Sequence, residues 1–204
     1  MATQSPIGPF SCQYTPQIPE LLLRLNCTLA ISTYQAGKLI LLSPKDENSL
    51  VQLPRHFEKA MGIAEDKEND KLAIALKNEV IIFRNSTELA RHYPRSPQKY
   101  DALYMPRVTY HTGPLDIHDL SFGKEGKLFA VNTLFSCLIT IDDNYNFTPY
   151  WTPPFIDKLV SEDRCHLNGM AMKDGLPKYA TAFNQGNFPW LNAVAYFGKP
   201  SFIA

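Results

Sequence analysis

Residues 117–142 read IHDLSFGKEGKLFAVNTLFSCLITID and carry the clearest fold signal in the chain. Apolar and polar residues alternate in HDLSF and again in CLITID, and the segment KLFAVNT between them is rich in residues that favour strands. The turns that join the three segments are too short for a crossover connection, so we expect antiparallel pairing. The stretch therefore predicts a meander, the building unit of a β-propeller blade.

The same rhythm of short strands and polar turns recurs on both sides of this stretch, in residues 27–57, 61–85 and 166–185. Aligning Gly62, Leu120 and Gly169 as equivalent positions gives spacings of 58 and 49 residues. These spacings are near the roughly 40 to 50 residues of known propeller repeats. The sequence thus predicts an all-β chain, a partial β-propeller of about four antiparallel meander blades.

Residues 15–26, TPQIPELLLRLN, predict a short N-terminal helix in which Thr15 is the cap. Its apolar stripe is expected to comprise Ile18, Leu21, Leu22 and Leu25. We expect residues 1–14 to form an arm, residues 15–185 the incomplete propeller-like domain, and residues 186–204 an atypical tail that lacks the strand rhythm.

Composition narrows the class of protein. Twenty basic residues balance twenty acidic ones, so no net field attracts the chain to nucleic acid or to an anionic membrane. The N-terminus does not resemble a signal peptide and no apolar run is long enough to span a membrane, which favours a cytoplasmic protein. Four scattered cysteines without a CxxC pair favour reduced thiols.

Four longer segments carry a family resemblance: STYQAGKLILLS, LYMPRVTYHTGPLDIHDLSF, VNTLFSCL and WTPPFIDKLVSEDRCHLNGMAM. Over residues 10–185 the chain resembles an uncharacterised family of conserved bacterial proteins, frequent in cyanobacteria and β-propeller-like. The resemblance implies a longer parent with further blades after Gln185, so this chain looks like an N-terminal fragment. It implies no established activity.

Polar residues at the starts of the inner strands are the first candidates for a site. In a propeller these strand ends face the central channel, and here they carry Asp116, His118, Asp119, His166 and Asn168. His118, Asp119, His166 and Asn168 could bind a divalent metal ion, and the two histidines and two carboxylates could instead share acid–base work. The alternative, which we favour, is that His118 and Asp119 hydrogen-bond the backbone between blades.

A second set of candidates comes from Asn132 and from the long connection before the central blade. Arg107, Tyr110 and His111 could line a pocket for an anionic or sugar-like ligand. Asn132 follows the second strand of the central blade, and turn chemistry explains an asparagine there equally well.

The chain contains no Gly-rich phosphate loop, no HExxH and no GxSxG. Our first hypothesis is a binding module for a small molecule or a protein partner, with no role in binding nucleic acid or membranes. The second is a metal-dependent hydrolase of the lactonase type, which rests on fold analogy alone. The third is a truncated chain without function.

Overall fold

The computed structural model describes residues 12–94, 96–188 and 201–203. The chain divides into two compact units, Met1–Glu58 and Lys59–Ala204, which we describe separately. Most of the expected N-terminal arm and most of the expected C-terminal tail lie outside the described residues.

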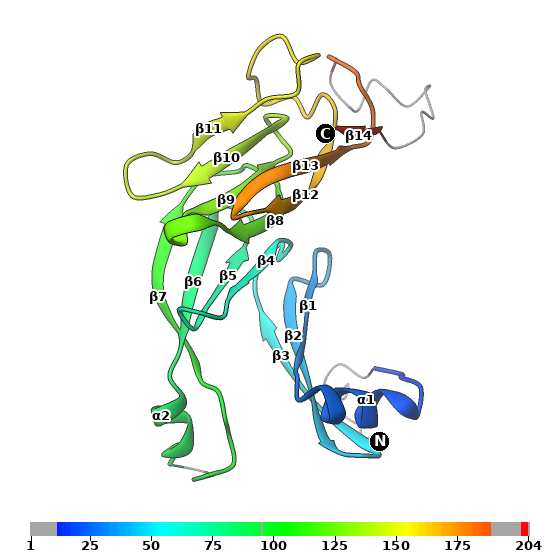
Figure 1. Cartoon of the computed structure of the whole chain (residues 1–204), viewed down its shortest axis with the longest axis vertical. Helices are drawn as coiled ribbons and strands as arrows, with labels where there is room; N and C mark the ends of the chain where they lie inside the picture. Colours follow the sequence, from blue (N-terminus) through cyan, green and yellow to red (C-terminus); the bar gives the residue numbers. More distant parts are fainter. Residues whose placement is uncertain (1–11, 95, 189–200, 204) are drawn as a thin grey trace, which may run out of the picture. The chain divides into compact units, whose positions relative to one another are not determined.

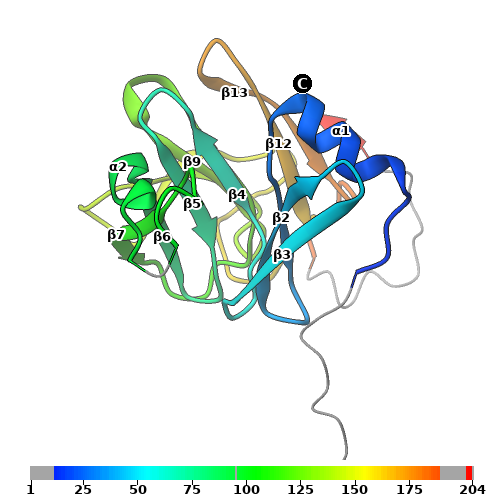
Figure 2. The ribbon, with the colours of Figure 1, turned by 90° about the horizontal axis from the view of Figure 1, so that it is seen from below.

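The unit Met1–Glu58 consists of one helix and one antiparallel sheet in the order β1-β2-β3. Its elements are α1 (Gln17–Leu25), β1 (Leu29–Thr33), β2 (Lys38–Asp46) and β3 (Ser49–His56). The helix packs against β2 (Figure 2). Facing residues of β2 and β3 include Leu41 with Leu53, and Ser43 with Val51, which therefore share one face of the sheet.

The short N-terminal helix is confirmed, but two details of its prediction were wrong. Pro16, not Thr15, is the N-cap, and it makes no side-chain cap bond. Leu22 is buried, whereas Leu21 and Leu25 are 49% and 62% exposed. The helix ends at Asn26, whose left-handed conformation (φ 49°) closes the last turn, so it is too short to bury a continuous stripe.

The unit Lys59–Ala204 contains three antiparallel sheets, each built from consecutive strands (Figure 1). The first comprises β4 (Ile63–Asp66), β5 (Lys71–Ala75), β6 (Glu79–Asn85) and β7 (Tyr104–His111). The second comprises β8 (Ile117–Phe122), β9 (Leu128–Asn132), β10 (Cys137–Ile141) and β11 (Thr148–Trp151). The third comprises β12 (Leu167–Lys173), β13 (Leu176–Ala182) and β14 (Ser201–Ile203).

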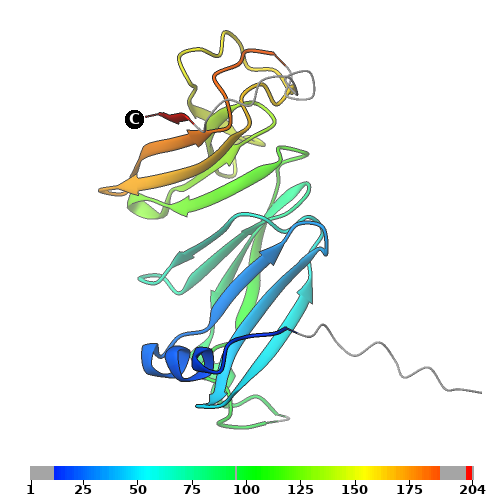
Figure 3. The same ribbon diagram turned by 90° about the vertical axis from the view of Figure 1, so that its right-hand side faces the viewer.

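The three sheets of this unit are stacked, and their first strands lie side by side. Strand β8 contacts both β4 and β12 (Figure 3). One apolar cluster joins β4–β6 to β8–β10 and includes Ala73, Ile117 and Leu120. A second joins β9 and β10 to β12 and β13 and includes Val131 and Leu167. The prediction of an all-β chain with four antiparallel meander sheets is therefore confirmed.

Strands also occur in two segments where the sequence pattern is weak. The long connection contains a short helix, α2 (Thr87–Arg91), and then β7, which forms the outer edge of its sheet. Within the expected atypical tail, β14 pairs with β13. All four cysteines are free, with Cys137 and Cys165 buried and Cys27 exposed. In the described part of the chain no helix is long and apolar enough to cross a membrane.

Candidate functional site

The chain enters each of the three first strands through the same local conformation. The first residue of each entrance has a left-handed backbone: Lys59 (φ 52°), Asp116 (φ 51°) and His166 (φ 48°). This conformation is uncommon for residues other than glycine. The residue that follows is buried and apolar in every case: Ala60, Ile117 and Leu167. The three entrances are therefore structural repeats of one another.

A β-bulge follows at the third position of two of these entrances. The pairing of β8 with β9 passes from Ile117 to Asp119 while its partner advances by one residue, so His118 is the extra residue. The pairing of β12 with β13 skips Asn168 in the same way. A bulge changes the direction in which a side chain points. Here it directs His118 and Asn168 toward each other across two sheets.

This repeat corrects the register that we expected from the sequence. Asp119 pairs with Val131 and Gly169 pairs with Thr181, and Gly62 takes the matching position before Ile63. Gly62 therefore corresponds to Asp119 and not to Leu120. The alignment was wrong by one residue because it did not allow for the extra residue that the bulge adds between Ile117 and Asp119.

The structure brings four of the predicted residues together with one more, and we name Asp116, His118, Asp163, His166 and Asn168 the entrance cluster. The rings of His118 and His166 are 4.9 Å apart, edge to face at 88°. The Asn168 amide donates to His118 Nδ1 at 3.2 Å, and His166 Nδ1 is 2.8 Å from Asp163 Oδ2. His118 Nε2 is 3.9 Å from Asp116 Oδ2.

These contacts fix the tautomer of one histidine and shift two pKa values. Because Asn168 Nδ2 can only donate, His118 Nδ1 accepts, and in the neutral ring Nε2 carries the hydrogen on the side of Asp116. The nearby His118 side chain lowers the pKa of Asp116, and the positive charge of Lys59 lowers it further. The hydrogen bond to Asp163 raises the pKa of His166.

The entrance cluster is partly open to solvent. The side chains of His118 and His166 are 14% and 24% exposed, and that of Asp116 is 36% exposed. Asp163 uses Oδ2 on His166, while its buried Oδ1 has no hydrogen-bond partner among the described residues. A buried acceptor of this kind calls for a partner from solvent or from a ligand.

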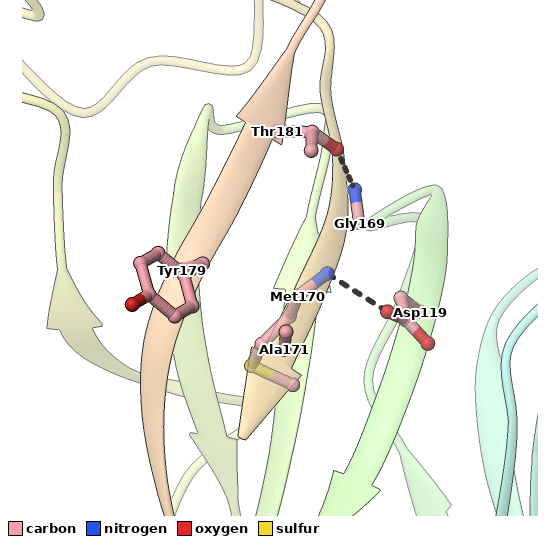
Figure 4. Close-up of a pocket in the computed structure, with 6 residues that line it drawn as sticks. All are labelled: Asp119, Gly169, Met170, Ala171, Tyr179 and Thr181. Atoms are coloured by element: carbon pink, nitrogen blue, oxygen red, sulfur yellow. Dashed lines mark hydrogen bonds between the residues drawn. The ribbon is translucent and has the colours of Figure 1, made fainter. Parts of the chain in front are cut away.

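Asp119 lies next to this cluster in sequence but has a different role. Its carboxylate accepts the backbone N–H of Leu120 through Oδ1 and that of Met170 through Oδ2, each at 2.9 Å. Figure 4 shows the second bond, which joins β8 to the main chain of β12. Burial is the largest influence on its pKa and raises it, although both hydrogen bonds act in the opposite direction. Asp119 thus links two sheets, as the structural alternative predicts.

Asn132 lies near the entrance cluster without joining it. It is fully buried and pairs with Ile117 on one side and Cys137 on the other. Its Oδ1 accepts the backbone N–H of Phe135 at 3.0 Å, which is turn chemistry, whereas its Nδ2 has no partner among the described residues.

The structure does not bring Arg107, Tyr110 and His111 to the entrance cluster. All three lie on β7, which β5 and β6 separate from the inner strand β4. The side chain of His111 is 83% exposed and its Nδ1 is 3.6 Å from Glu79. Tyr110 packs against the first apolar cluster. These residues belong to the outer edge of the sheet, with two strands between them and the inner strand.

The arrangement of the four proposed metal ligands does not suit a metal ion. In the described residues, no group of three or more His, Cys, Asp and Glu side chains is placed to hold one. His118 Nδ1 already accepts from Asn168, and the carboxylate of Asp119 is bonded to main-chain N–H groups.

Lys59 and Asp163 were not predicted as site residues. Lys59 has no counterpart of like chemistry at the other two entrances, since Asp116 and His166 occupy those positions. Asp163 stands in a loop with its backbone at φ 44°, three residues before His166. The separation of Asp163 and His166 by only three residues is the one feature of the sequence that could have indicated their hydrogen bond.

Two solved structures resemble the chain. It is similar to the solved structure of virginiamycin B lyase from Staphylococcus aureus, with 12% identity, a TM-score of 0.41, and coverage of 77% of this chain and 45% of that chain. It is also similar to the Chaetomium thermophilum Nup170 NTD-Nup53 complex, with 12% identity, a TM-score of 0.42, and coverage of 91% and 30%.

The chain spans less than half the length of either of these two proteins. No curated protein matches it. A family model described as a domain of unknown function, DUF4915, matches residues 16–193, and the chain therefore belongs to that family.

Proposed function

We propose that this chain is a binding module that holds a small polar molecule at the entrance cluster. The observation that supports this proposal is the direct contact of His118 with His166 and Asn168. His118 lies at the start of β8, and His166 and Asn168 lie at the start of β12, the inner strand of the next sheet. Bulges and left-handed residues hold them there, and such costly backbone features concentrate at functional sites.

The chemistry of the cluster favours a neutral hydroxylated ligand, such as a sugar or polyol. Asp116 and Asp163 offer acceptors, Asn168 offers an amide, and His166 has a raised pKa that favours its cationic form. A strongly anionic ligand would meet two carboxylates, and a cationic one would meet His166. Adjacent hydroxyl groups donate and accept, so they match this mixture. Among the residues that the structure describes, no group of three or more His, Cys, Asp and Glu side chains is placed to hold the metal ion that the alternative hydrolase would need.

An NMR titration of the imidazole resonances tests the proposal. The probes are a panel of monosaccharides and polyols, with inorganic phosphate and zinc as separate arms. We expect at least one hydroxylated probe to shift the resonances of both His118 and His166 at millimolar concentration. Asn168→Ala should weaken this response about tenfold, since it removes a hydrogen bond that orients His118.

The matched control is His92→Gln, at the C-cap of α2. The side chain of His92 is 73% exposed and contacts Glu88 of that helix. This variant should leave the titration unchanged. The proposal fails if no hydroxylated probe shifts either resonance, or if zinc binds stoichiometrically through both imidazoles while the hydroxylated probes do not.

A further inference from the structure

The two connections that lead into the entrance cluster differ in length. The connection from β7 to β8 is residues 112–116, which reach Asp116 directly. The connection from β11 to β12 is the much longer loop 152–166, and it supplies both Asp163 and His166 (Figure 1). This loop therefore needs contacts of its own to bring the two side chains to the cluster.

The end of the loop is anchored on the turn between β9 and β10. The N–H of Asp163 donates to the carbonyl of Leu134 at 2.8 Å. The N–H groups of Arg164 and Cys165 both donate to Ser136 Oγ, at 3.1 and 3.3 Å. These bonds hold the loop by its backbone, and none of them involves one of its side chains.

The side chain of Arg164 ties the rest of the loop to this anchored end. It is 8% exposed, and among the buried polar residues that the structure describes it is the only charged one. Its Nε donates to Glu162 Oε2 at 2.9 Å, and Nη2 is equally close to that oxygen. Its Nη1 donates to the Asp157 carboxylate and, at 2.8 Å, to Asn187 Oδ1. A buried guanidinium is costly unless it is paired in this way.

The three partners of Arg164 come from different parts of the chain. Asp157 belongs to the first half of the loop, Glu162 immediately precedes Asp163, and Asn187 follows β13. The side chains of Asp157 and Glu162 are 61% and 41% exposed, so both already contact water. Loss of the guanidinium would release these carboxylates to solvent and would not leave them buried without a partner.

The backbone is left-handed on both sides of Arg164, at Asp163 (φ 44°) and at His166 (φ 48°). Residues other than glycine persist in this conformation only where surrounding contacts hold them. The hydrogen bond between His166 Nδ1 and Asp163 Oδ2, at 2.8 Å, spans the same short segment. The contacts of Arg164 thus lie where the loop has to be held for this bond to form.

We propose that Arg164 is the positioning residue of the entrance cluster, which holds Asp163 within hydrogen-bond distance of His166. The inference rests on the proposed function, since it names what keeps that site assembled. It can nevertheless be measured without a ligand. The hydrogen bond to Asp163 is the largest influence on the pKa of His166 and raises it, and the charge of Asp116 adds a smaller increase.

An NMR titration of the imidazole resonances of Arg164→Met with pH, in the absence of ligand, tests the proposal. Methionine is long and unbranched but has no hydrogen-bond donor. We expect the pKa of His166 to fall toward 6.5 while circular dichroism shows a folded chain. Loss of a positive charge would by itself raise the pKa of a nearby imidazole, so a fall identifies the loss of the bond to Asp163.

Two further measurements on Arg164 variants sharpen the test. The monosaccharide or polyol that shifts both imidazole resonances of the wild type should bind Arg164→Met about tenfold more weakly. Arg164→Lys keeps the charge but offers one nitrogen in place of three, so it should restore the affinity and the pKa of His166 only in part.

The matched control is Lys158→Met, which removes a positive charge from an exposed position of the same loop. It should leave the pKa of His166 unchanged. Combination with Asp163→Asn distinguishes positioning from stabilisation of the loop. Once the carboxylate is absent, Arg164→Met should no longer change the pKa of His166.

The outcomes separate this inference from the proposed function. A pKa of His166 that is the same in Arg164→Met as in the wild type overturns the inference, whether or not a hydroxylated probe binds. A pKa that falls in a chain that binds no hydroxylated probe supports the positioning role and contradicts the proposed function. If Arg164→Met does not fold, Arg164→Lys and Asn187→Ala provide the same test, and an unchanged pKa of His166 in both overturns the inference.

Discussion

The β8–β9 face and the β12–β13 face have the same construction but opposite exposure. Each carries an aromatic residue on its second strand, yet Phe129 is 1% exposed and Tyr179 is 50% exposed. Phe129 pairs with Ser121 as Tyr179 pairs with Ala171, although the β12–β13 pairing shifts register between Ala171 and Met172 and the β8–β9 pairing does not shift at the matching place. The two faces also differ in whether another sheet packs on top, and the comparison shows that a position's burial in a repeat protein depends on its neighbour as much as on its own sheet.

The largest expected effect comes from truncating the two aromatic residues of this comparison. Phe129→Ala should lower the free energy of unfolding by about 3 to 5 kcal/mol, because it opens a cavity in a packed interface. Tyr179→Ala should change it by about 0.5 kcal/mol or less in the isolated chain, because half of its side chain is in water. Urea denaturation followed by circular dichroism, at a concentration where the chain is monomeric, measures both.

If Phe129→Ala and Tyr179→Ala lowered the free energy of unfolding equally, both faces would have to be covered in the monomer, and the contrast between them would be wrong. Tyr150→Ala is a useful control for the loss of an aromatic contact alone. Tyr150 is 44% exposed and its ring centroid is 5.0 Å from that of Phe129. Its cost should lie between the other two.

A smaller effect is expected at the two glycines of the inner strands. Gly62→Ala forces a methyl group against main-chain atoms of β8 that cannot rotate away, and should cost about 1 to 3 kcal/mol. Gly169→Ala meets the Thr181 hydroxyl, a side-chain group, and should cost less than about 1 kcal/mol. The same denaturation measurement applies. A larger loss for Gly169→Ala than for Gly62→Ala would contradict an open position at β12.

The strands were predictable from the sequence because sheets packed in this way have short turns and strong alternation. The turn at 123–126 and the alternating segments around it are sufficient to place β8, β9 and β10. The bulges at His118 and Asn168 were not predicted, although each shifts the phase of the alternation by one residue. The apolar residues Ile117 and Leu120 are three residues apart, as are Leu167 and Met170. Because this shift was not taken into account, the predicted alignment was wrong by one residue.

The sequence predicted that His118 and His166 lie at one site, but the structural reason is different from the one expected. Both histidines were expected to face the central channel because they stand at the starts of inner strands. In the structure His166 matches Asp116, and His118 matches Asn168. The two rings touch because the third position of one entrance faces the first position of the next. Arg107 was misplaced because Pro106 interrupts the strand pattern and the pairing shifts at that point, which made an edge strand resemble a loop.

The smallest expected effect concerns the pH dependence of stability at the entrance cluster, where Asp116 and His166 occupy equivalent positions with opposite charge. The hydrogen bond to Asp163 raises the pKa of His166 above its ordinary value of 6.5. Folding therefore favours the imidazolium. Its contribution is complete below pH 6.5 and is lost as the pH rises through the higher pKa of the folded state.

Asp116 behaves in the opposite way, because the nearby His118 side chain lowers its pKa below 3.8. Its contribution is present above pH 3.8 and is lost as the pH falls through the lower pKa of the folded state. The two together should give a stability maximum between about pH 4 and 6.5. His166→Gln should abolish the decline above pH 6.5 and leave the acid limb in place, while Asp116→Asn should do the reverse. Denaturation curves measured from pH 3 to 9 test both, and a decline above pH 6.5 that persists in His166→Gln would show that the pairing with Asp163 does not control it.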